Sequence, residues 1–224
     1  MNPTQSAQTY DLFIFDFDGT LADSRLNITS SMNAAFTHFG YTVVDPNDIH
    51  PLIGKLSFEQ TFRKFQPQLD TDQVGALMSH ARGYQREHLQ NEMMVFPDTV
   101  ATLQTLKDQG KALAVLTTKY VEQMEYILQA MGLRPFFDVV YGDGLIAAKK
   151  PDRACVEYIW NNLSAPILPE RSVMIGDSEV DVLCAQNAGI DAIGVGRGVD
   201  SLDYLREKGA IYTLDTLAEL MQFI

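Results

Sequence analysis

Two carboxylates follow directly on a short apolar segment near the start of the chain. Residues 12–15 are Leu-Phe-Ile-Phe, and Asp16 and Asp18 come next, with Phe17 between them. An apolar segment of aromatic and branched residues is typical of a buried strand, and side chains two positions apart on extended backbone point the same way. We therefore expect Asp16 and Asp18 to face one point just beyond a strand, with Gly19 allowing the turn that follows.

This pair of carboxylates allows two interpretations. Two like charges held this close cannot both ionise freely, so the proton affinity of one should rise. A divalent cation would offset the repulsion, and oxygen ligands of this kind suit Mg2+. Alternatively, the strand ends in turn residues that are simply solvated. Taken alone, the D-x-D pattern of Asp16 and Asp18 leaves both interpretations open.

Further polar residues stand at the ends of later apolar segments that predict strands. Thr117 follows residues 112–116, Asp177 follows residues 172–175, and Lys150 lies in a loop before a proline. Each has a simpler explanation by itself, as a strand former, a turn residue or a solvated lysine. At one rim, however, the Thr117 hydroxyl could donate to a phosphate oxygen, and Lys150 could neutralise charge on a nucleophile and a transferring group.

The residues after Asp177 carry a real ambiguity. Ser178 and Asp181 match the S-x-x-D capping pattern that begins a helix, and capping alone explains both of them. It does not explain Asp177, for which a third oxygen ligand to a metal is the more economical interpretation. Asp181 could hold the helix start and also support the shell around the metal.

The elements that must position these residues form two groups. From residue 96 onward, apolar segments alternate with helical patterns, which predicts an α/β fold with a doubly wound parallel sheet. The carboxyl ends of such strands meet at one edge, where function gathers. Residues 23–95 are helical in pattern and contain no convincing strand. We expect a core of residues 10–22 and 96–224, interrupted by a helical cap of residues 23–95, with Phe58, Phe62 and Phe65 forming part of the cap's own core.

Composition narrows the class of protein. The 224 residues carry 17 basic and 29 acidic side chains, a formal net charge of -12, which argues against general binding to nucleic acid or anionic membranes. No apolar segment reaches transmembrane length, and residues 1–9 lack the apolar centre of a signal peptide. We expect a soluble cytoplasmic protein with disordered first residues. Cys155 and Cys184 form no C-x-x-C pair and are expected to be buried thiols.

The ordered set of motifs resembles the haloacid dehalogenase superfamily over about residues 11–224. The first motif of that family is similar to Asp16-Phe-Asp-Gly-Thr-Leu, the second to Thr117, the third to Lys150-Pro151, and the fourth to the segment from Gly176 to Asp181. The helical insertion after the first motif is similar to the C1 cap of the phosphoglycolate phosphatase-like branch. Where family members often have Thr-Asn-Lys, this chain has Thr-Thr-Lys from residue 117, which leaves the subfamily open.

The resemblance implies Mg2+ as cofactor and an aspartyl-phosphate intermediate. Asp16 would attack phosphorus, and Asp18 would protonate the leaving oxygen and then act as base on the hydrolytic water. These roles agree with the chemistry of carboxylates as nucleophiles and as acid–base groups. The metal would be held by Asp16, Asp177 and the backbone carbonyl of Asp18.

The resemblance also implies groups that hold the substrate, which is expected to be a small phosphorylated metabolite. Thr117, Lys150 and the backbone amides of Gly19 and Thr20 would hold the phosphoryl oxygens, and Thr118 is expected to contact the substrate. In the cap, Gly54-Lys55 resembles a substrate-facing loop. Lys55 could meet a second anionic group or could be an exposed loop lysine, and Arg63 is a weaker candidate.

Three functions remain open on the sequence. The first is a magnesium-dependent phosphatase of phosphoglycolate phosphatase type, acting as a monomer or homodimer. The second is a phosphomutase of β-phosphoglucomutase type, in which the phosphoaspartate returns its phosphoryl group to a sugar phosphate. The third is a catalytically weak binding or regulatory protein, against which the presence of Asp16, Asp18, Lys150 and Asp177 argues.

Overall fold

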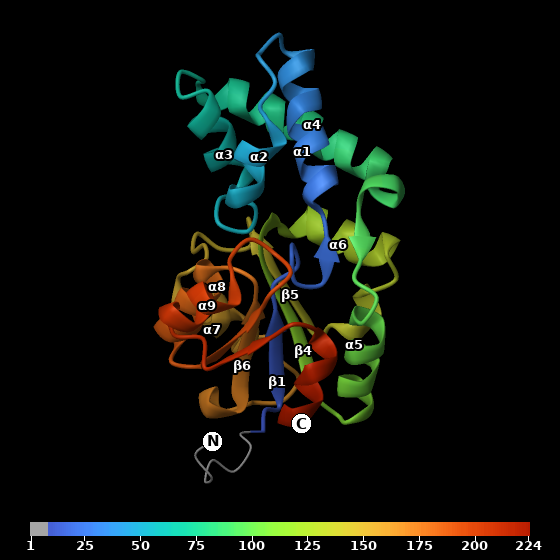
Figure 1. Ribbon diagram of the computed structural model, residues 1–224, viewed down its shortest axis with the longest axis vertical. Helices are drawn as coiled ribbons and strands as arrows, with labels where there is room; N and C mark the ends of the chain where they lie inside the picture. Colours follow the sequence, from blue (N-terminus) through green and yellow to red (C-terminus); the bar gives the residue numbers. More distant parts are fainter. Residues whose placement is uncertain (1–8) are drawn as a thin grey trace.

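A parallel sheet forms the centre of the protein (Figure 1). The computed structural model describes residues 9–224; residues 1–8, most of the segment expected to be disordered, lie outside the described residues. Within residues 9–224 the sheet has six strands in the order β5-β4-β1-β6-β7-β8. Their bounds are β1 (Leu12–Phe15), β4 (Ala112–Tyr120), β5 (Val139–Asp143), β6 (Ser172–Gly176), β7 (Asp191–Val195) and β8 (Tyr212–Leu214).

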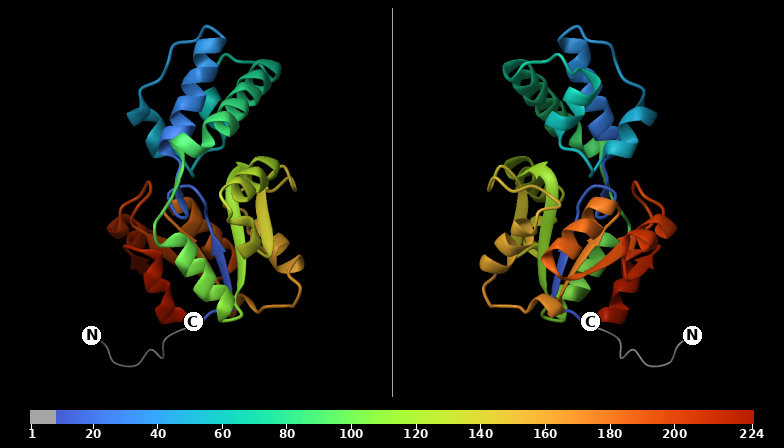
Figure 2. Two further views of the ribbon diagram at one scale, coloured as in Figure 1. Left: turned by 90° about the vertical axis from the view of Figure 1, so that its right-hand side faces the viewer. Right: turned by 90° about the vertical axis from the view of Figure 1, so that its left-hand side faces the viewer.

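Helices cover both faces of this sheet (Figure 2), as a doubly wound α/β fold requires. The helices on one face are α5 (Thr99–Asp108), α6 (Val121–Ala130) and the 3-10 helix η4 (Leu217–Phe223). Those on the other face are α7 (Arg153–Asn161), α8 (Glu179–Ala188) and α9 (Leu202–Lys208). Two 3-10 turns complete this part, η2 (Arg134–Phe136) and η3 (Pro169–Arg171). The predicted fold class is confirmed.

The central strand β1 explains why the opening apolar segment shows no alternation of polar and apolar residues. Phe13 and Phe15 belong to the core on one face of the sheet, and Leu12 and Ile14 to the core on the other. A strand buried on both faces needs apolar residues at every position. The strand pairs in parallel with β4 on one side and β6 on the other, so the residues that follow these three strands meet at one edge.

A layer of helices stands over the carboxyl ends of the strands (Figure 1). Its elements are α1 (Arg25–His38), α2 (Pro46–Ile49), the 3-10 helix η1 (His50–Leu52), α3 (Phe58–Phe65) and α4 (Thr71–Glu92). They enclose a separate apolar core in which Phe62 is fully buried and Phe58 and Phe65 pack against it. The stripe predicted from these three phenylalanines is therefore part of that core. Capping boxes begin α3 at Ser57 and α4 at Asp70.

The joint between the cap and the sheet differs from the expectation that residues 23–95 contain no strand. Two-residue strands, β2 (Ala22–Asp23) and β3 (Met94–Val95), pair antiparallel where the chain leaves and re-enters the sheet domain. The two crossings pair because they run side by side, which no local pattern reveals. The sequence offers Asp23 or Ser24 as the cap of the first cap helix; Ser24 stands at the N-cap position of α1, but its side chain does not cap the helix.

Strand β4 is longer than predicted. We expected it to end at Leu116, before Thr117, yet it continues to Tyr120, with a register shift against β5 between Leu116 and Tyr120. Threonine and tyrosine favour extended backbone, so the polar residues prolong the strand rather than end it. As a result, Thr117 and Lys119 lie two positions apart on one extended segment.

Smaller differences concern the ends of the chain's last elements. The apolar patterns also predict strands over residues 137–141 and 210–213 and a final helix over 217–223. The two strands, β5 and β8, begin two residues later than predicted, and the final helix is the 3-10 helix η4. These shifts are within the usual uncertainty of boundaries read from sequence. Among residues 9–224, no helix combines the length and apolar character that a membrane span requires.

Candidate active site

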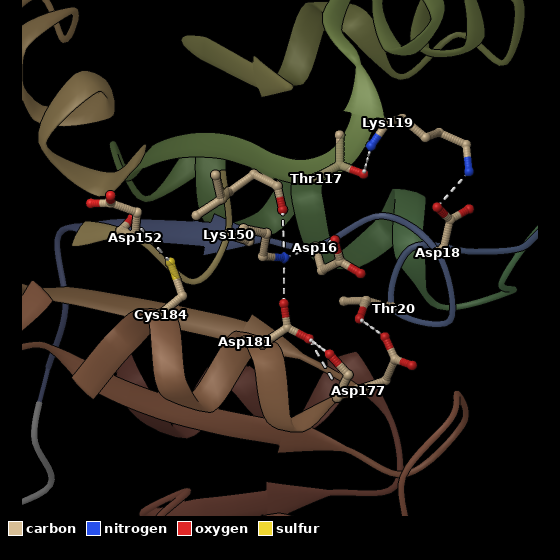
Figure 3. A network of polar contacts seen from close by, with 12 residues as sticks. Asp16, Asp18, Thr20, Thr117, Lys119, Lys150, Asp152, Asp177, Asp181 and Cys184 are labelled. Atoms are coloured by element: carbon tan, nitrogen blue, oxygen red, sulfur yellow. Dashed lines mark hydrogen bonds and ion pairs between the residues drawn. The ribbon is translucent and has the colours of Figure 1, made fainter. Parts of the chain in front are cut away.

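Three carboxylates converge at the carboxyl edge of the sheet (Figure 3). Asp16 follows β1, Asp177 follows β6, and Asp181 lies in the first turn of α8. One oxygen of each lies within 4.8 Å of the others, and all three residues are buried. They meet because β1 and β6 are neighbouring parallel strands that end at the same level.

Lys150 is the cation of this cluster. Its ammonium group donates to Asp16 Oδ1 at 3.1 Å and to the carbonyl oxygen of Leu116 at 2.9 Å, and it forms a short ion pair with Asp181. The side chain is only 1% exposed. The structure thus places Lys150 beside one oxygen of Asp16, while among the described residues none donates a hydrogen bond to the other oxygen, Oδ2.

Asp177 is held in one orientation by two donors. The Thr20 hydroxyl donates to Oδ1 at 3.0 Å, and the backbone amide of Val199 donates to Oδ2 at 2.8 Å. Two glycines allow this close approach: a Cβ on Gly19 would lie 2.6 Å from Asp177 Oδ2, and a Cβ on Gly198 would overlap the same carboxylate. Gly19 also has a φ of +73°, which favours glycine.

Burial dominates the electrostatics of the cluster. It raises the pKa of Asp16 to about 7, against the opposing effect of Lys150. Burial, and then the charges of Asp16 and Asp181, raise the pKa of Asp177 well above its usual range. Burial disfavours the Lys150 cation, but Asp16 and Asp181 outweigh it and raise the pKa of that lysine.

The charge and the donor atoms of this cluster suit a divalent cation. Three buried carboxylates face a single buried lysine, so the cluster lacks positive charge. The donor set consists of carboxylate oxygens, which Mg2+ prefers. Asp16 and Asp177 suit such an ion, and Asp181 is close enough to take part. The residues present therefore fit the metal that the sequence motifs imply.

Asp181 joins the start of α8, as expected, and its role toward a metal stays a prediction. One of its oxygens accepts hydrogen bonds from the Ser178 amide at 3.0 Å and from the Ser178 hydroxyl at 2.7 Å, which joins it to the start of α8. Its other oxygen pairs with Lys150. The sequence predicted Asp181 as a residue that supports the metal ligands without binding the metal. In the structure one of its oxygens lies within 4.8 Å of oxygens of Asp16 and Asp177, close enough to bind the same ion.

The side chain of Asp18 does not join this cluster. Its Oδ2 lies 2.5 Å from the Lys119 ammonium group, and its Oδ1 accepts a short hydrogen bond from the Ser24 hydroxyl. Asp18 is 3% exposed. The expected metal ligand was its backbone carbonyl rather than its carboxylate, and that assignment stays a prediction. The carboxylate itself lies outside the cluster of Asp16, Asp177 and Asp181, and its charge contributes to raising the pKa of Asp16.

The predicted phosphate-binding amides need a correction. Gly19 N donates to the carbonyl of Ala22 at 2.9 Å, and Thr20 N donates to that of Phe17 at 3.3 Å. The turn after β1 closes on itself and uses both groups internally, so neither remains for a ligand. The contribution of Thr20 to the site is instead its hydroxyl, which positions Asp177.

Thr117 and Thr118 have different positions at the end of β4. Thr117 is 1% exposed, and its Oγ1 accepts a hydrogen bond from Lys119 N at 3.2 Å, which leaves the hydroxyl proton available to a ligand oxygen. Thr118 lines a cavity between the cap and the sheet, together with Asp18 and Lys119. Both positions agree with contact to a substrate, which stays a prediction.

This cavity is lined by Asp18, the residue expected to act as acid and base. Its volume is about 40 Å3. Gly54, in the cap, also lines it; a Cβ there would be 3.8 Å from Asp16 Oδ2, and the φ of Gly54 is +77°. A cap residue therefore covers the unbonded oxygen of Asp16.

The cap lysine predicted to meet a second anionic group has another partner. Lys55 Nζ donates to Asp200 Oδ1 at 2.7 Å, and Asp200 Oδ2 accepts from the backbone amide of Glu179. Lys55 therefore ties the cap to the start of α8. The weaker candidate, Arg63, bonds Glu59 and the carbonyl of Leu69 within the cap.

Two contributors were missed by sequence reasoning. Lys119 was seen only as part of Thr-Thr-Lys, although its spacing from Thr117 on extended backbone would have placed both side chains on one side. The sequence gives no function to the glycine-rich loop after β7, whereas in the structure Gly198 and Val199 of this loop pack against Asp177.

Known proteins share this sequence pattern and fold. Residues 13–195 match the family described as haloacid dehalogenase-like hydrolase. A protein of Dickeya dadantii named probable phosphatase IndB is 32% identical over 213 residues, covering 94% of this chain and 91% of the relative. Phosphoglycolate phosphatase of Colwellia psychrerythraea is 29% identical, covering 96% of each chain. A solved structure of a haloacid dehalogenase-like hydrolase from Bacteroides fragilis has a TM-score of 0.85 at 29% identity, covering 95% of this chain and 100% of the other.

Proposed function

The chain belongs to the haloacid dehalogenase-like hydrolases, and from that premise we propose that it is a magnesium-dependent phosphatase. Its substrate is the phosphomonoester of a small metabolite, and its intermediate is an aspartyl-phosphate on Asp16. One observation carries the proposal: Asp16 has one oxygen held by Lys150, while the other oxygen has no hydrogen bond from the described residues and faces the cap. A carboxylate oxygen without a donor is available as a nucleophile.

In the first step, Asp16 Oδ2 forms a bond to phosphorus, and the bond between phosphorus and the ester oxygen breaks. The leaving oxygen takes a proton from the Asp18 carboxyl group. Lys150 neutralises charge beside Asp16, and the Thr117 hydroxyl donates to a phosphoryl oxygen. Phosphoryl transfer needs mostly such positioning and neutralisation.

In the second step, water hydrolyses the aspartyl-phosphate. Asp18, now a carboxylate, takes a proton from the water, whose oxygen forms a bond to phosphorus as the bond to Asp16 breaks. Inorganic phosphate leaves and Asp16 is restored. Lys119 and Ser24 hold the carboxylate of Asp18 throughout. The cap, through Gly54, limits access of other water to Asp16.

The metal would be held by Asp16 and Asp177, with Asp181 close to both. When bound, Mg2+ would neutralise the charge of the transferring group and of the carboxylates around it. Other residues hold these carboxylates in position. Thr20 and Val199 orient Asp177, and the Lys150 ammonium group lies between Asp16 and Asp181 and bonds both.

The relatives support a small substrate. The Colwellia relative is named for the hydrolysis of phosphoglycolate, a two-carbon phosphomonoester. The cavity lined by Asp18 has a volume of about 40 Å3, which favours a leaving group of few atoms. We therefore include phosphoglycolate, sugar phosphates and nucleotides in the panel that tests the proposal.

The test is phosphate release from this panel with Mg2+ and with EDTA, combined with acid quenching and mass spectrometry of the Asp16 peptide. Asp16→Asn keeps the shape of the side chain and should abolish turnover and the phosphopeptide. Asp203→Asn, at an exposed side chain (89%), is the matched control and should behave as the wild type. Full activity of Asp16→Asn, or activity unaffected by EDTA, would contradict the proposal.

A further inference from the structure

Two buried side chains of the cap, beside the cavity lined by Asp18, carry unsatisfied hydrogen-bond donors. Arg82 and Gln85, both on α4, line this cavity. Arg82 Nη2 and Gln85 Nε2 are buried and have no hydrogen-bond partner within residues 9–224. Gln85 is 1% exposed, so its amide has no access to bulk water. Buried donors without a partner cost free energy, and a cavity beside them suggests that a ligand supplies the acceptor.

The orientation of Gln85 follows from a chain of contacts. Arg86 Nε donates to Gln123 Oε1 at 2.9 Å, which fixes that amide with its Nε2 toward Gln85. Gln123 Nε2 then donates to Gln85 Oε1 at 3.5 Å. An arginine can only donate, so exchanging oxygen and nitrogen in the amide of Gln123 or of Gln85 would break this series of hydrogen bonds. The free end of Gln85 is therefore its NH2 group.

Arg82 presents a positive charge at the same place. Its guanidinium lies over the ring of Tyr120 in β4, with 4.0 Å from Cζ to the ring centroid. Stacking on an aromatic face orients the group and leaves its N–H donors in plane. No ion pair neutralises Arg82 among the residues that the structure describes. The cavity therefore has one unpaired cation and one amide donor on its cap side.

We propose that Arg82 and Gln85 bind a second anionic group, carried by the leaving group of the substrate. The inference rests on the proposed phosphatase function and narrows its substrate class to small phosphomonoesters whose leaving group ends in a carboxylate or a phosphate. Apolar side chains, among them Ile28, Met32 and Ile53, also line the cavity. A low local dielectric strengthens a charge-assisted hydrogen bond made there.

The position of the donors also sets a geometric requirement. Arg82 and Gln85 belong to the cap, whereas Tyr120 and Gln123, which orient them, belong to the sheet domain. The anion subsite is therefore complete only with the cap seated on the sheet. Asp18 and Lys119 line the same cavity, so the second anionic group would lie on the leaving-group side of the transferred phosphoryl group.

The experiment compares two esters of nearly equal size. Phosphoglycolate has an anionic leaving group, and 2-hydroxyethyl phosphate has a neutral one. Arg82→Met keeps an unbranched side chain over Tyr120 and removes the charge. It should lower kcat/KM for phosphoglycolate by roughly 10- to 100-fold and that for 2-hydroxyethyl phosphate by less than about twofold. Arg82→Lys should recover part of the loss, and Lys64→Met, at an exposed cap lysine, should change neither.

Further substrates and a binding measurement distinguish the possible results. Pyrophosphate replaces the carboxylate by a phosphate, so comparing it with phosphoglycolate shows which anion the subsite takes. An equal fall for charged and neutral esters, or no fall for either anionic substrate, would overturn the proposal. If the wild type hydrolyses no ester, the proposed function fails, and calorimetric titration with glycolate still tests the subsite. Binding must then be weaker in Arg82→Met by roughly 10-fold or more, and equal or absent binding would overturn it.

Discussion

The ammonium group of Lys119 lies 2.5 Å from Asp18 Oδ2, and the Ser24 hydroxyl donates to the other oxygen of the same carboxylate. Lys119 belongs to β4 of the sheet, and Ser24 stands at the start of the cap helix α1. The carboxylate proposed as acid and base is therefore held from both sides of the joint between cap and sheet.

Lys119→Met should lower kcat by roughly 10- to 100-fold for every substrate, because Asp18 loses a charge-assisted hydrogen bond that orients it. Steady-state kinetics with the neutral ester 2-hydroxyethyl phosphate checks this without involving the anion subsite. The matched control is Lys149→Met, whose ammonium pairs with Asp143 and is 46% exposed; its kcat should stay within about twofold. A similar kcat in Lys119→Met would show that Lys119 does not position Asp18.

Lys150→Met should destabilise the metal-free protein by about 3–5 kcal/mol, because it leaves Asp16 and Asp181 buried without their cation. Urea unfolding in EDTA measures this loss. Mg2+ should return part of the stability, since an ion that binds only the folded state stabilises it. Lys107→Met removes a half-exposed pair with Asp138 and should cost less than about 1 kcal/mol. Equal losses in the two variants would refute the buried network.

The fold class could be predicted because a strand buried on both faces of a parallel sheet is a short continuous apolar segment, as in β1. The end of β4 could not. Thr117 and Lys119 are polar, which suggests a loop, yet Thr117 is buried and Lys119 lies at a cavity beside the Asp18 carboxylate. Asp18 precedes Lys119 by 101 positions in the chain, and no local pattern contains that information.

In the candidate site, too, some residues could be predicted from the sequence and others could not. Asp16 and Asp177 could be proposed from sequence because each follows an apolar segment, and the structure brings them together. Contacts between cap and sheet could not be proposed. Lys55 pairs with Asp200, 145 positions away. Arg82 could be identified as a candidate ligand-binding residue only from the structure, where it stacks on Tyr120. Local spacing identifies strand ends, whereas domain packing decides which cations are paired.

Gly198→Ala should lower kcat/KM by roughly 100-fold or more and weaken Mg2+ binding. A Cβ at this position overlaps the carboxylate of Asp177, so the loop or the carboxylate must move, and small displacements of a reacting group are costly. Kinetics over a Mg2+ titration measures both effects. The control is Gly75→Ala in α4, where a Cβ meets nothing within 4 Å; it should stabilise the protein by about 0.5–1 kcal/mol without loss of activity. Normal Mg2+ dependence in Gly198→Ala would contradict the assigned role of Asp177.

The burial of Asp143, at the end of β5, predicts that the free energy of unfolding depends on pH. Asp143 is 1% exposed and pairs with the Lys149 ammonium at 3.3 Å, and among the described residues no other group donates a hydrogen bond to its oxygens. Burial raises the pKa of Asp143, with Lys149 opposing it. A folded-state pKa above the unfolded one means that the ionised group lowers stability. This loss is absent below the unfolded pKa, grows as pH rises above it, and is complete above the folded pKa.

Asp143→Asn removes this titration while keeping the shape of the side chain. Its Tm should therefore exceed that of the wild type at about pH 8, and the difference should shrink toward zero as the pH falls to about 4, near the unfolded pKa of aspartate. Thermal unfolding of both proteins across this range, at constant ionic strength, gives the comparison. Asp203→Asn, exposed on α9, should show a difference that hardly changes with pH. A Tm difference for Asp143→Asn that is negative at pH 8, or constant with pH, would mean that Lys149 stabilises the buried carboxylate more than burial destabilises it.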